Sequence, residues 1–298
     1  MQFKHIAFPI MCGDTENTAK RDLERLARRF GSRVSLLKVF QSYNSYADIE
    51  RAFSDASAYL STSHNARRLL NFYDVDVPSE HVQRVLLEGD PASEITQWVN
   101  DNMVDLVVLG AANGVHIGDC LIGSAATRLM HDSACNIWFG GFEGESKLYA
   151  SDSQSARIVC GLGLDEEAVA LLKFADELGH GFGAEVAVVH SIAAPLDVIE
   201  KDMDREEIER EQTVAGTHYP VRLSHQGIAN AVTQTAGSEH ADLIVIGRGH
   251  SQNHLGSLWT HAYSTIRHAP CPVLSHCCKA REQRAMAVES NALAAAAR

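Results

Sequence analysis

The sequence predicts two tandem α/β domains, each with a doubly wound, five-stranded parallel sheet. The first observation is an internal repeat, in which DLVVLG at 105–110 recurs as DLIVIG at 242–247, and SACNI at 133–137 recurs as APCPV at 269–273. Copies about 137 residues apart are too far apart for a solenoid unit and fit a whole small domain. The second observation is that short apolar runs alternate with helical patterns, and parallel strands need such crossover connections.

The strands expected in the first half are apolar or alternating runs at 5–9, 34–40, 80–86, 106–109 and 136–139. The helices expected between them lie at 15–30, 46–72, 91–102 and 124–130. Gly31 ends the first helix, because glycine readily adopts the left-handed conformation that follows a helix. Pro91 opens the third helix, because the first turn does not need its missing N–H.

The second half repeats this order after an interruption at 144–155. Its strands are expected at 157–160, 185–190, 220–223, 243–246 and 272–276, and its helices at 166–178, 198–212, 228–240 and 258–268. We therefore expect one domain at 1–145 and another at 155–278. The Ala-rich tail at 279–298 is interpreted as a frayed or loosely docked helix.

The composition is that of a folded protein without a nucleic-acid or membrane partner. Of its 298 residues, 45% are hydrophobic and 21% are charged, so each half can bury a sizeable core. The formal net charge of −12 disfavours nucleic-acid binding, because no Lys/Arg stripe is present to displace counterions from phosphates. No apolar run approaches the roughly 20 residues of a membrane span, and residues 1–4 carry no signal-peptide pattern. We therefore expect a cytoplasmic protein.

The pattern of cysteines and histidines gives little support for a metal site. The seven cysteines include no CxxC pair, and an odd number in a long chain does not indicate a disulfide framework. Cys277 and Cys278 follow His276, but adjacent side chains on a strand point to opposite faces, so only one thiol would reach a shared ion. His261 and His268 would lie two helical turns apart, about 10 Å, which is too far for both to bind one ion without further ligands. We expect no metal beyond Mg²⁺ accompanying a nucleotide.

The loop after the fourth strand is where this fold would bind a ligand. In a doubly wound sheet, ligands bind beyond the carboxyl ends of the strands, where the strand order reverses. Residues 110–124 form this loop and include four glycines before Ser124. Ser124 opens the next helix, where its hydroxyl and the free backbone N–H groups can hold an anion.

Three motifs make the chain similar to tandem universal stress proteins. The family motif Gly-x2-Gly-x9-Gly-(Ser/Thr) resembles the loop that ends at Gly123-Ser124, and two further family segments resemble 88–95 and 267–274. The resemblance covers almost the whole chain, twice over. It implies an adenine nucleotide alpha hydrolase-like fold in each half. It also implies an intramolecular pseudo-dimer, in which the fifth strands, 136–139 and 272–275, meet across a pseudo-two-fold axis.

Many members of this family bind ATP, and the resemblance implies an adenine nucleotide site in the first half. Asn113 followed by Gly114 replaces the second glycine of the motif, and Asn tolerates the left-handed conformation that a glycine supplies. Met11 replaces the family's adenine-contacting Asp and offers no comparable acceptor. The expected site residues are Pro9, Ile10, Val39, Leu109, Gly110, Asn113, Gly114, Gly123, Ser124 and Ala125.

The second half departs further from the family motif, and its site is expected to be degenerate. Counting back from Cys271 places His250 at the second glycine and Trp259-Thr260 at the Gly-Ser pair. A Trp would obstruct a phosphate there, because the backbone must approach the phosphate closely. Gly163 replaces the adenine-contacting Asp.

The expected function is that of a stress-response protein which binds ATP or ADP in its first half as a regulatory ligand. The alternative is a nucleotide-free interaction module for a protein partner or a lipid-like small molecule, because both adenine-contacting Asp residues are replaced. An enzyme is not expected, since no residue can be named as a general base, although slow ATP hydrolysis is left open. A homodimer is also left open.

Overall fold

The computed structural model describes residues 3–10, 15–40, 56–110, 122–142, 146–149, 155–192, 198–248 and 257–278. These residues fall into two compact units that divide between Ile137 and Trp138. Each unit is an α/β domain, and the units correspond closely to the first and second halves of the chain.

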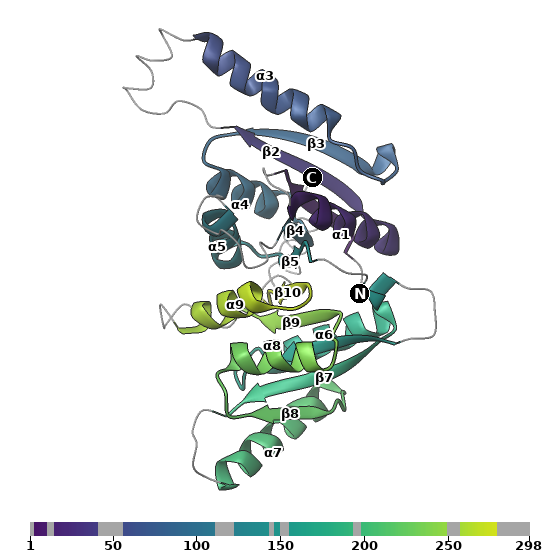
Figure 1. Ribbon diagram of the computed structural model, residues 1–298, viewed down its shortest axis with the longest axis vertical. Helices are drawn as coiled ribbons and strands as arrows, with labels where there is room; N and C mark the ends of the chain where they lie inside the picture. Colours follow the sequence, from purple (N-terminus) through teal and green to yellow (C-terminus); the bar gives the residue numbers. More distant parts are fainter. Residues whose placement is uncertain are drawn as a thin grey trace, which may run out of the picture. The chain divides into compact units, whose positions relative to one another are not determined.

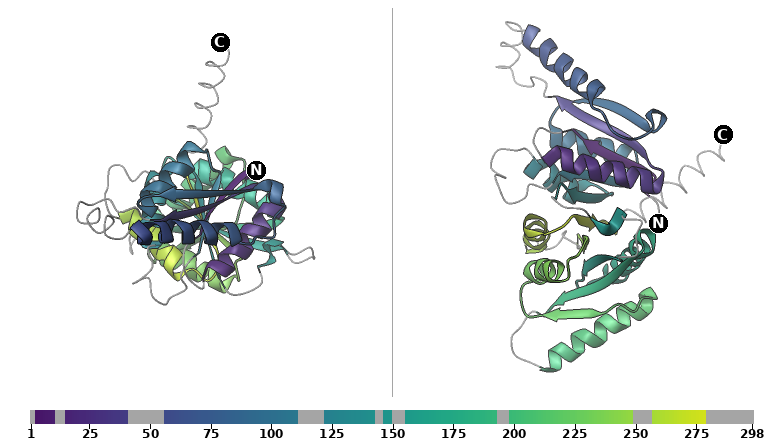
Figure 2. Two further views of the ribbon diagram at one scale, coloured as in Figure 1. Left: turned by 90° about the horizontal axis from the view of Figure 1, so that it is seen from above. Right: turned by 45° about the vertical axis from the view of Figure 1, so that its right-hand side comes forward.

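The described elements of the first half are, in chain order, β1 (His5–Pro9), α1 (Thr15–Phe30), β2 (Arg33–Phe40), α3 (Ala56–Phe72), η1 (Ser79–His81), β3 (Val82–Glu88), α4 (Pro91–Asp101), β4 (Leu106–Gly110), α5 (Ile122–Asp132) and β5 (Asn136–Gly140). The strand order is β3-β2-β1-β4-β5 (Figure 1). The pairs β1–β2, β2–β3 and β1–β4 are parallel. α3 packs along β2 and β3, and α4 packs beside α5 (Figure 2).

The second half repeats this arrangement. Its described elements are β6 (Ala156–Gly161), α6 (Ala168–Phe182), β7 (Ala184–Ser191), α7 (Val198–Ala215), β8 (Val221–Ser224), α8 (Ile228–Ser238), β9 (Leu243–Gly247), α9 (Ser257–His268) and β10 (Val273–His276). The strand order is β10-β9-β6-β7-β8, and the pairs β6–β7, β6–β9, β7–β8 and β9–β10 are parallel.

The core of each half is built on its central strands. Every residue of β1 is buried, and in β4 and β9 all residues before the final glycine are buried. Such strands form continuous apolar runs because helices cover both faces of a parallel sheet. β3 lies at the edge of its sheet and contains no buried residue, so it is more exposed than the half-buried strand that its alternating pattern predicted.

Local signals explain where helices begin and end. Gly31 follows α1 with φ 61°, and Gly183 follows α6 with φ 68°, both in the left-handed region that glycine adopts at low cost. The carboxylate of Asp90 accepts a hydrogen bond from the Ser93 N–H at 2.9 Å and caps α4, which opens with Pro91. This bond from the Ser93 backbone, together with one from the Ser93 hydroxyl, lowers the pKa of Asp90.

The predicted order of strands and helices is confirmed in both halves, and most ends move by one or two residues. β3 begins at Val82 because residues 79–81 form the 3-10 helix η1, and the helix expected at 228–240 ends at Ser238. The expected helix start at 46 and the tail at 279–298 lie outside the described residues. The pairing of the two halves through their fifth strands and the domain limits 1–145 and 155–278 stay predictions.

A repeated hydrogen bond accompanies the sequence repeat. The Asp105 carboxylate accepts from the backbone N–H of His5 at 2.8 Å, and the Asp242 carboxylate accepts from the backbone N–H of Arg157 at 2.9 Å. Each Asp directly precedes the corresponding strand, β4 or β9. The first strands, β1 and β6, can therefore be superposed residue by residue, with His5 at the place of Arg157.

A short 3-10 helix, η2 (Lys147–Tyr149), lies within the predicted join at 144–155 and packs on the second half. The Lys147 N–H donates to Asp242 Oδ1 at 2.8 Å. The Leu148 side chain is buried, and the Tyr149 ring lies edge-on to Phe182 with 6.1 Å between centroids. The ordered packing of the second half therefore includes residues that precede β6.

Candidate functional site

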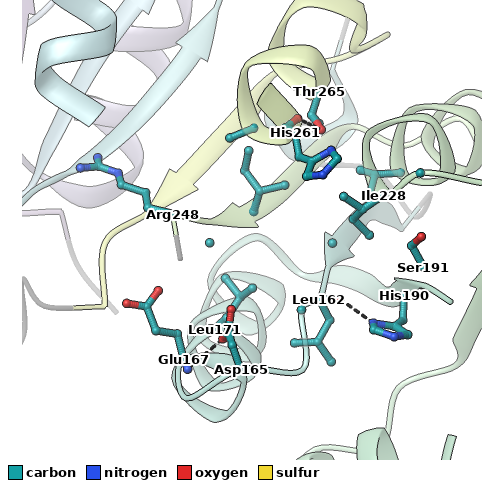
Figure 3. A pocket seen from close by; sticks show the side chains of 17 residues that line it. Leu162, Asp165, Glu167, Leu171, His190, Ser191, Ile228, Arg248, His261 and Thr265 are labelled. Atoms are coloured by element: carbon teal, nitrogen blue, oxygen red, sulfur yellow. Dashed lines mark hydrogen bonds between the residues drawn. The ribbon is translucent and has the colours of Figure 1, made fainter. Parts of the chain in front are cut away.

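A cavity of about 420 Å³ lies at the carboxyl ends of β6, β7 and β9 in the second half (Figure 3). This is the edge of a doubly wound sheet at which ligands bind. Apolar side chains line it from several elements: Leu162 after β6, Leu171 on α6, Ile228 and Val232 on α8, and Ile246 on β9. The volume is within the range of small-molecule sites.

Glycine is required in this lining at Gly161, the last residue of β6. A Cβ atom at Gly161 would lie 2.8 Å from Val232 Cγ2 and 3.4 Å from Ile246 Cγ2. Both neighbours are buried, β-branched side chains that cannot easily move aside. The missing side chain therefore lets α8 approach β6 closely.

His190, near the end of β7, supplies a buried polar group to the cavity. Its Nδ1 lies 2.9 Å from the Leu162 carbonyl oxygen, an acceptor, so Nδ1 carries the hydrogen and donates. Its Nε2 lies 3.6 Å from the Asp204 carboxylate on α7. The ring is therefore held between β6 and α7.

Asp165 supplies a carboxylate beside Gly163, where the sequence pattern showed no acceptor. Asp165 Oδ1 accepts from the Glu167 N–H at 2.9 Å in the turn that leads into α6. A Cβ atom at Gly163 would lie 3.2 Å from Asp165 Oδ2. The turn thus brings an acid to the cavity from two residues further along the chain. The run Asp165-Glu166-Glu167 before a helix was the sequence signal that could have indicated it.

Basic groups come from the opposite side of the cavity. Arg248 follows β9, and its Nε donates to the Ser275 hydroxyl at 3.2 Å. His261 on α9 faces Asp165 across the cavity (Figure 3). The cavity therefore combines an apolar lining with both acidic and basic side chains, and these polar residues were not predicted as site residues.

In the first half, the described members of the predicted site lie at the equivalent sheet edge. Pro9 ends β1, Ile10 follows it, Val39 lies near the end of β2, and Leu109-Gly110 end β4. The Ile10 N–H donates to the Leu37 carbonyl at 2.7 Å, which extends the β1–β2 pairing to the end of the strand. Because β1 pairs with both β2 and β4, these ends are neighbours.

For the other members of the predicted sites, the structure describes either the backbone alone or nothing. Met11, Asn113, Gly114 and His250 lie outside the described residues. The backbone places Gly123, Ser124 and Ala125 in the first turn of α5, whereas their side chains are not described. Likewise, α9 begins at Ser257, so Trp259 is the third residue of its first turn. Ser257 is the first residue of α9, and Ser is typical of helix starts.

The cysteines of the described chain are mostly buried. Burial raises the pKa of Cys160 and of Cys271 to about 12, so both stay protonated thiols. Cys277 and Cys278 are partly exposed. Within the described ranges, no group of three or more His, Cys, Asp or Glu side chains is arranged to hold a metal ion. Within the same ranges, no helix is long and apolar enough to cross a membrane.

Known proteins resemble this chain in both sequence and structure. The model of the universal stress protein family matches residues 2–139 and 155–275. A curated universal stress protein from Methanothermobacter thermautotrophicus is 32% identical over 60 residues, which are 20% of this chain and 40% of that protein. A universal stress protein structure from Archaeoglobus fulgidus is 16% identical, with a TM-score of 0.61 over 92% of this chain and 98% of that one, and shows the same fold.

A second structure from Archaeoglobus fulgidus is that of a universal stress protein in complex with dAMP. It is 22% identical, with a TM-score of 0.34, and the match covers 41% of this chain and 97% of that one. The match to the curated protein from Methanothermobacter thermautotrophicus covers less than half of the length of that protein.

Proposed function

This chain belongs to the universal stress protein family, and from that premise we propose that it binds ATP or ADP in its first half as a regulatory ligand of a stress response. The observation that carries the proposal is the gathering of Pro9, Ile10, Val39 and Gly110 at the ends of three neighbouring strands. Ser124 lies in the first turn of the helix that follows the loop. A base and a chain of phosphates need this combination of apolar edge and helix start.

The two parts of the nucleotide would use different groups of the site. The base would lie against Ile10 and Val39, whose backbone and apolar side chains form the wall. The phosphates, with their Mg²⁺, would lie at the start of α5, where free backbone N–H groups and the helix dipole attract anions. Because Met11 offers no acceptor to an amino group, discrimination between adenine and guanine is expected to be weak.

The proposed role is binding rather than catalysis. The described members of the predicted site are Pro9, Ile10, Val39, Leu109 and Gly110, and none of them carries a carboxylate or an imidazole that could serve as a general base. Any hydrolysis of ATP is therefore expected to be slow. We propose that the second half does not bind the triphosphate, because its loop lacks the second glycine of the motif and has Trp259 in the first turn of α9.

Calorimetry with ATP, ADP and GTP tests this proposal. We expect one nucleotide to bind per chain, with dissociation constants below about 1 mM. Absence of binding at millimolar ligand would contradict the proposal. Native mass spectrometry of the purified protein gives an independent result, since a co-purifying nucleotide would supply its identity directly.

The second-half cavity favours a second candidate function. Its lining of leucine, isoleucine and valine side chains suits an apolar or lipid-like small molecule, and such a ligand would not need the phosphate-binding loop. In that case, the chain would be a nucleotide-free interaction module. Native mass spectrometry would then show a bound acyl compound and no nucleotide.

A further inference from the structure

His5, the first residue of β1, is buried at the opposite end of that strand from Pro9, with 3% of its surface exposed. Its Nδ1 lies 2.8 Å from the Arg33 guanidinium and 3.3 Å from the backbone carbonyl of Asn102. Its Nε2 lies 2.8 Å from the Ser35 hydroxyl. These contacts come from β2 and from the end of α4.

The Arg33 contact determines which ring nitrogen of His5 carries the hydrogen. A guanidinium can only donate, so Nδ1 must accept, and the hydrogen lies on Nε2. Nε2 then donates to Ser35, whose hydroxyl can donate to the Gln83 side chain at 3.4 Å. His5 is therefore neutral in this arrangement, in which hydrogen bonds link β1, β2 and β3.

A proton added to Nδ1 would change its partner. The new N–H could no longer accept from Arg33, and two positive charges would be in contact. The Asn102 carbonyl, 3.3 Å from the same nitrogen, is an acceptor within reach. Protonation therefore exchanges a bond to β2 for a bond to the C-terminal end of α4.

The second half contains a permanently charged version of this site. Arg157 takes the place of His5 and pairs with Glu185 in the strand register, as His5 pairs with Arg33. Arg157 Nη2 contacts the Glu185 carboxylate at 3.3 Å, and Nη1 donates to the Glu239 carbonyl at 3.0 Å. Glu239 caps the end of α8, as Asn102 caps the end of α4. The bond that protonated His5 would form is therefore already present in the second half.

We propose that His5 is a pH-sensitive switch in the first half. In the neutral state, His5 holds Arg33 on β2. In the protonated state, it donates to the Asn102 carbonyl and releases Arg33, so β2 loses a contact with β1.

Two groups of interactions compete over the proton. Burial of the ring and the touching Arg33 guanidinium oppose protonation. The Asp105 carboxylate, bonded to the His5 backbone, and the Asn102 carbonyl favour it. The Trp98 ring, with centroids 5.9 Å apart, lies at 79° to the imidazole and carries no charge. Arg33 contacts the titrating nitrogen directly, whereas Asp105 contacts the backbone, so opposition dominates.

Protonation of His5 should lower the stability of the folded first half. An unfolded histidine gains its proton near pH 6.5. If the folded state binds that proton less readily, stability is complete above this pH and is lost as the pH falls below it. For a single group, the ratio of folded to unfolded first half should fall up to about tenfold between pH 7.5 and 5.5.

NMR titration of the ring-labelled full chain tests the switch. The His5 signal, identified by its loss in His5→Gln, should titrate at lower pH in the folded protein than in the urea-unfolded protein. Arg33→Met should move the folded midpoint upward by about one pH unit, equivalent to tenfold tighter proton binding. A folded midpoint at or above the unfolded one, or no shift on Arg33→Met, would overturn the proposal.

Hydrogen exchange in the full chain provides a local readout. After correction for intrinsic rates, peptides covering β1 and β2 should lose protection between pH 7.5 and 5.5, whereas peptides covering β6 and β7 should not. The double variant His5→Arg with Arg33→Glu copies the second-half pair and should abolish this loss. The reciprocal variant Arg157→His with Glu185→Arg should introduce such a loss in the second half. If the wild type and the first double variant lose protection equally, the switch does not exist.

Discussion

The two halves hold the same backbone atom with different side chains at the edge where ligands would bind. Lys38 Nζ donates to the carbonyl of Ile10 at 3.1 Å, and His190 Nδ1 donates to the carbonyl of Leu162 at 2.9 Å. Ile10 and Leu162 each follow the first strand of their half and pair equivalently with the second strand. In both halves this backbone carbonyl accepts a hydrogen bond from a side chain, but the side chain that donates differs between the halves.

The choice of donor changes the charge of the site. Lysine places a full positive charge beside Ile10, at the sheet edge where the nucleotide is proposed to bind. Histidine satisfies the same carbonyl while neutral and presents its second nitrogen to Asp204. At this one position the first half therefore has a lysine where the second half has an imidazole.

The largest effect is expected on the packing of the second half. Gly161→Ala would place a methyl group 2.8 Å from Val232 Cγ2, and such overpacking should lower the free energy of unfolding by about 1–3 kcal/mol. Gly247→Ala is the matched control, because Gly247 ends β9 as Gly161 ends β6 and its Cβ would meet Leu171 Cδ2 at an ordinary contact distance of 3.5 Å. Urea unfolding of both variants measures the difference. Equal stability would show that α8 can move away from β6 without cost.

The second largest effect is expected on nucleotide affinity, and it tests whether the nucleotide binds in the first half. Gly123→Trp should fill the space needed by the phosphates and lower nucleotide affinity at least tenfold, about 1.4 kcal/mol. Trp259→Gly should change the affinity little. Calorimetry with ATP on both variants is the measurement, and equal losses would show that the halves share the site.

A smaller effect is expected from the donor to the strand-end carbonyl. Lys38→Met removes a hydrogen bond and a positive charge beside Ile10, and should weaken ATP binding about fivefold, or roughly 1 kcal/mol. His190→Met is the corresponding change in the second half and should leave ATP binding unaltered. A larger loss from the second variant would place the nucleotide in the second half.

The smallest effect is expected at Asp204. Its carboxylate is 3.6 Å from His190 and 30% exposed, so the ion pair is worth less than about 1 kcal/mol. Asp204→Asn should therefore lower the free energy of unfolding by less than about 1 kcal/mol. Urea unfolding of the variant and the wild type measures this. A loss of about 3 kcal/mol or more would indicate that the two side chains behave as a buried ion pair.

Much of the fold could be predicted because central parallel strands are apolar along their whole length. The strands β4 and β9 repeat almost the same residues, and each is buried as expected. The edge strand β3 was placed less well, because its burial is partial and a 3-10 turn at 79–81 delays its start. Weak burial gives a weak pattern at this edge, but helix ends moved further, because α6 ends at Phe182 and not at 178.

The candidate site was harder to predict because its chemistry depends on turns. The residues Pro9, Ile10, Val39 and Gly110, which the family resemblance implied, lie at one sheet edge, and their role in binding stays a prediction. The comparison with the family motif assigned Gly163 alone to the position of the adenine-contacting Asp. It could not show that the side chain of Asp165, two residues later in the turn, lies beside Gly163. It also did not predict the cavity of the second half, which depends on the close approach of α8 at Gly161.

The position of η2 determines where a fragment that contains only the second half should begin. The Asp242 carboxylate holds two backbone amides, that of Arg157 through Oδ2 and that of Lys147 through Oδ1. A fragment beginning at residue 155 would lack both the Lys147 amide and the buried Leu148 side chain. A fragment of the second half should therefore begin before residue 146, so that it keeps the helix that packs on β6.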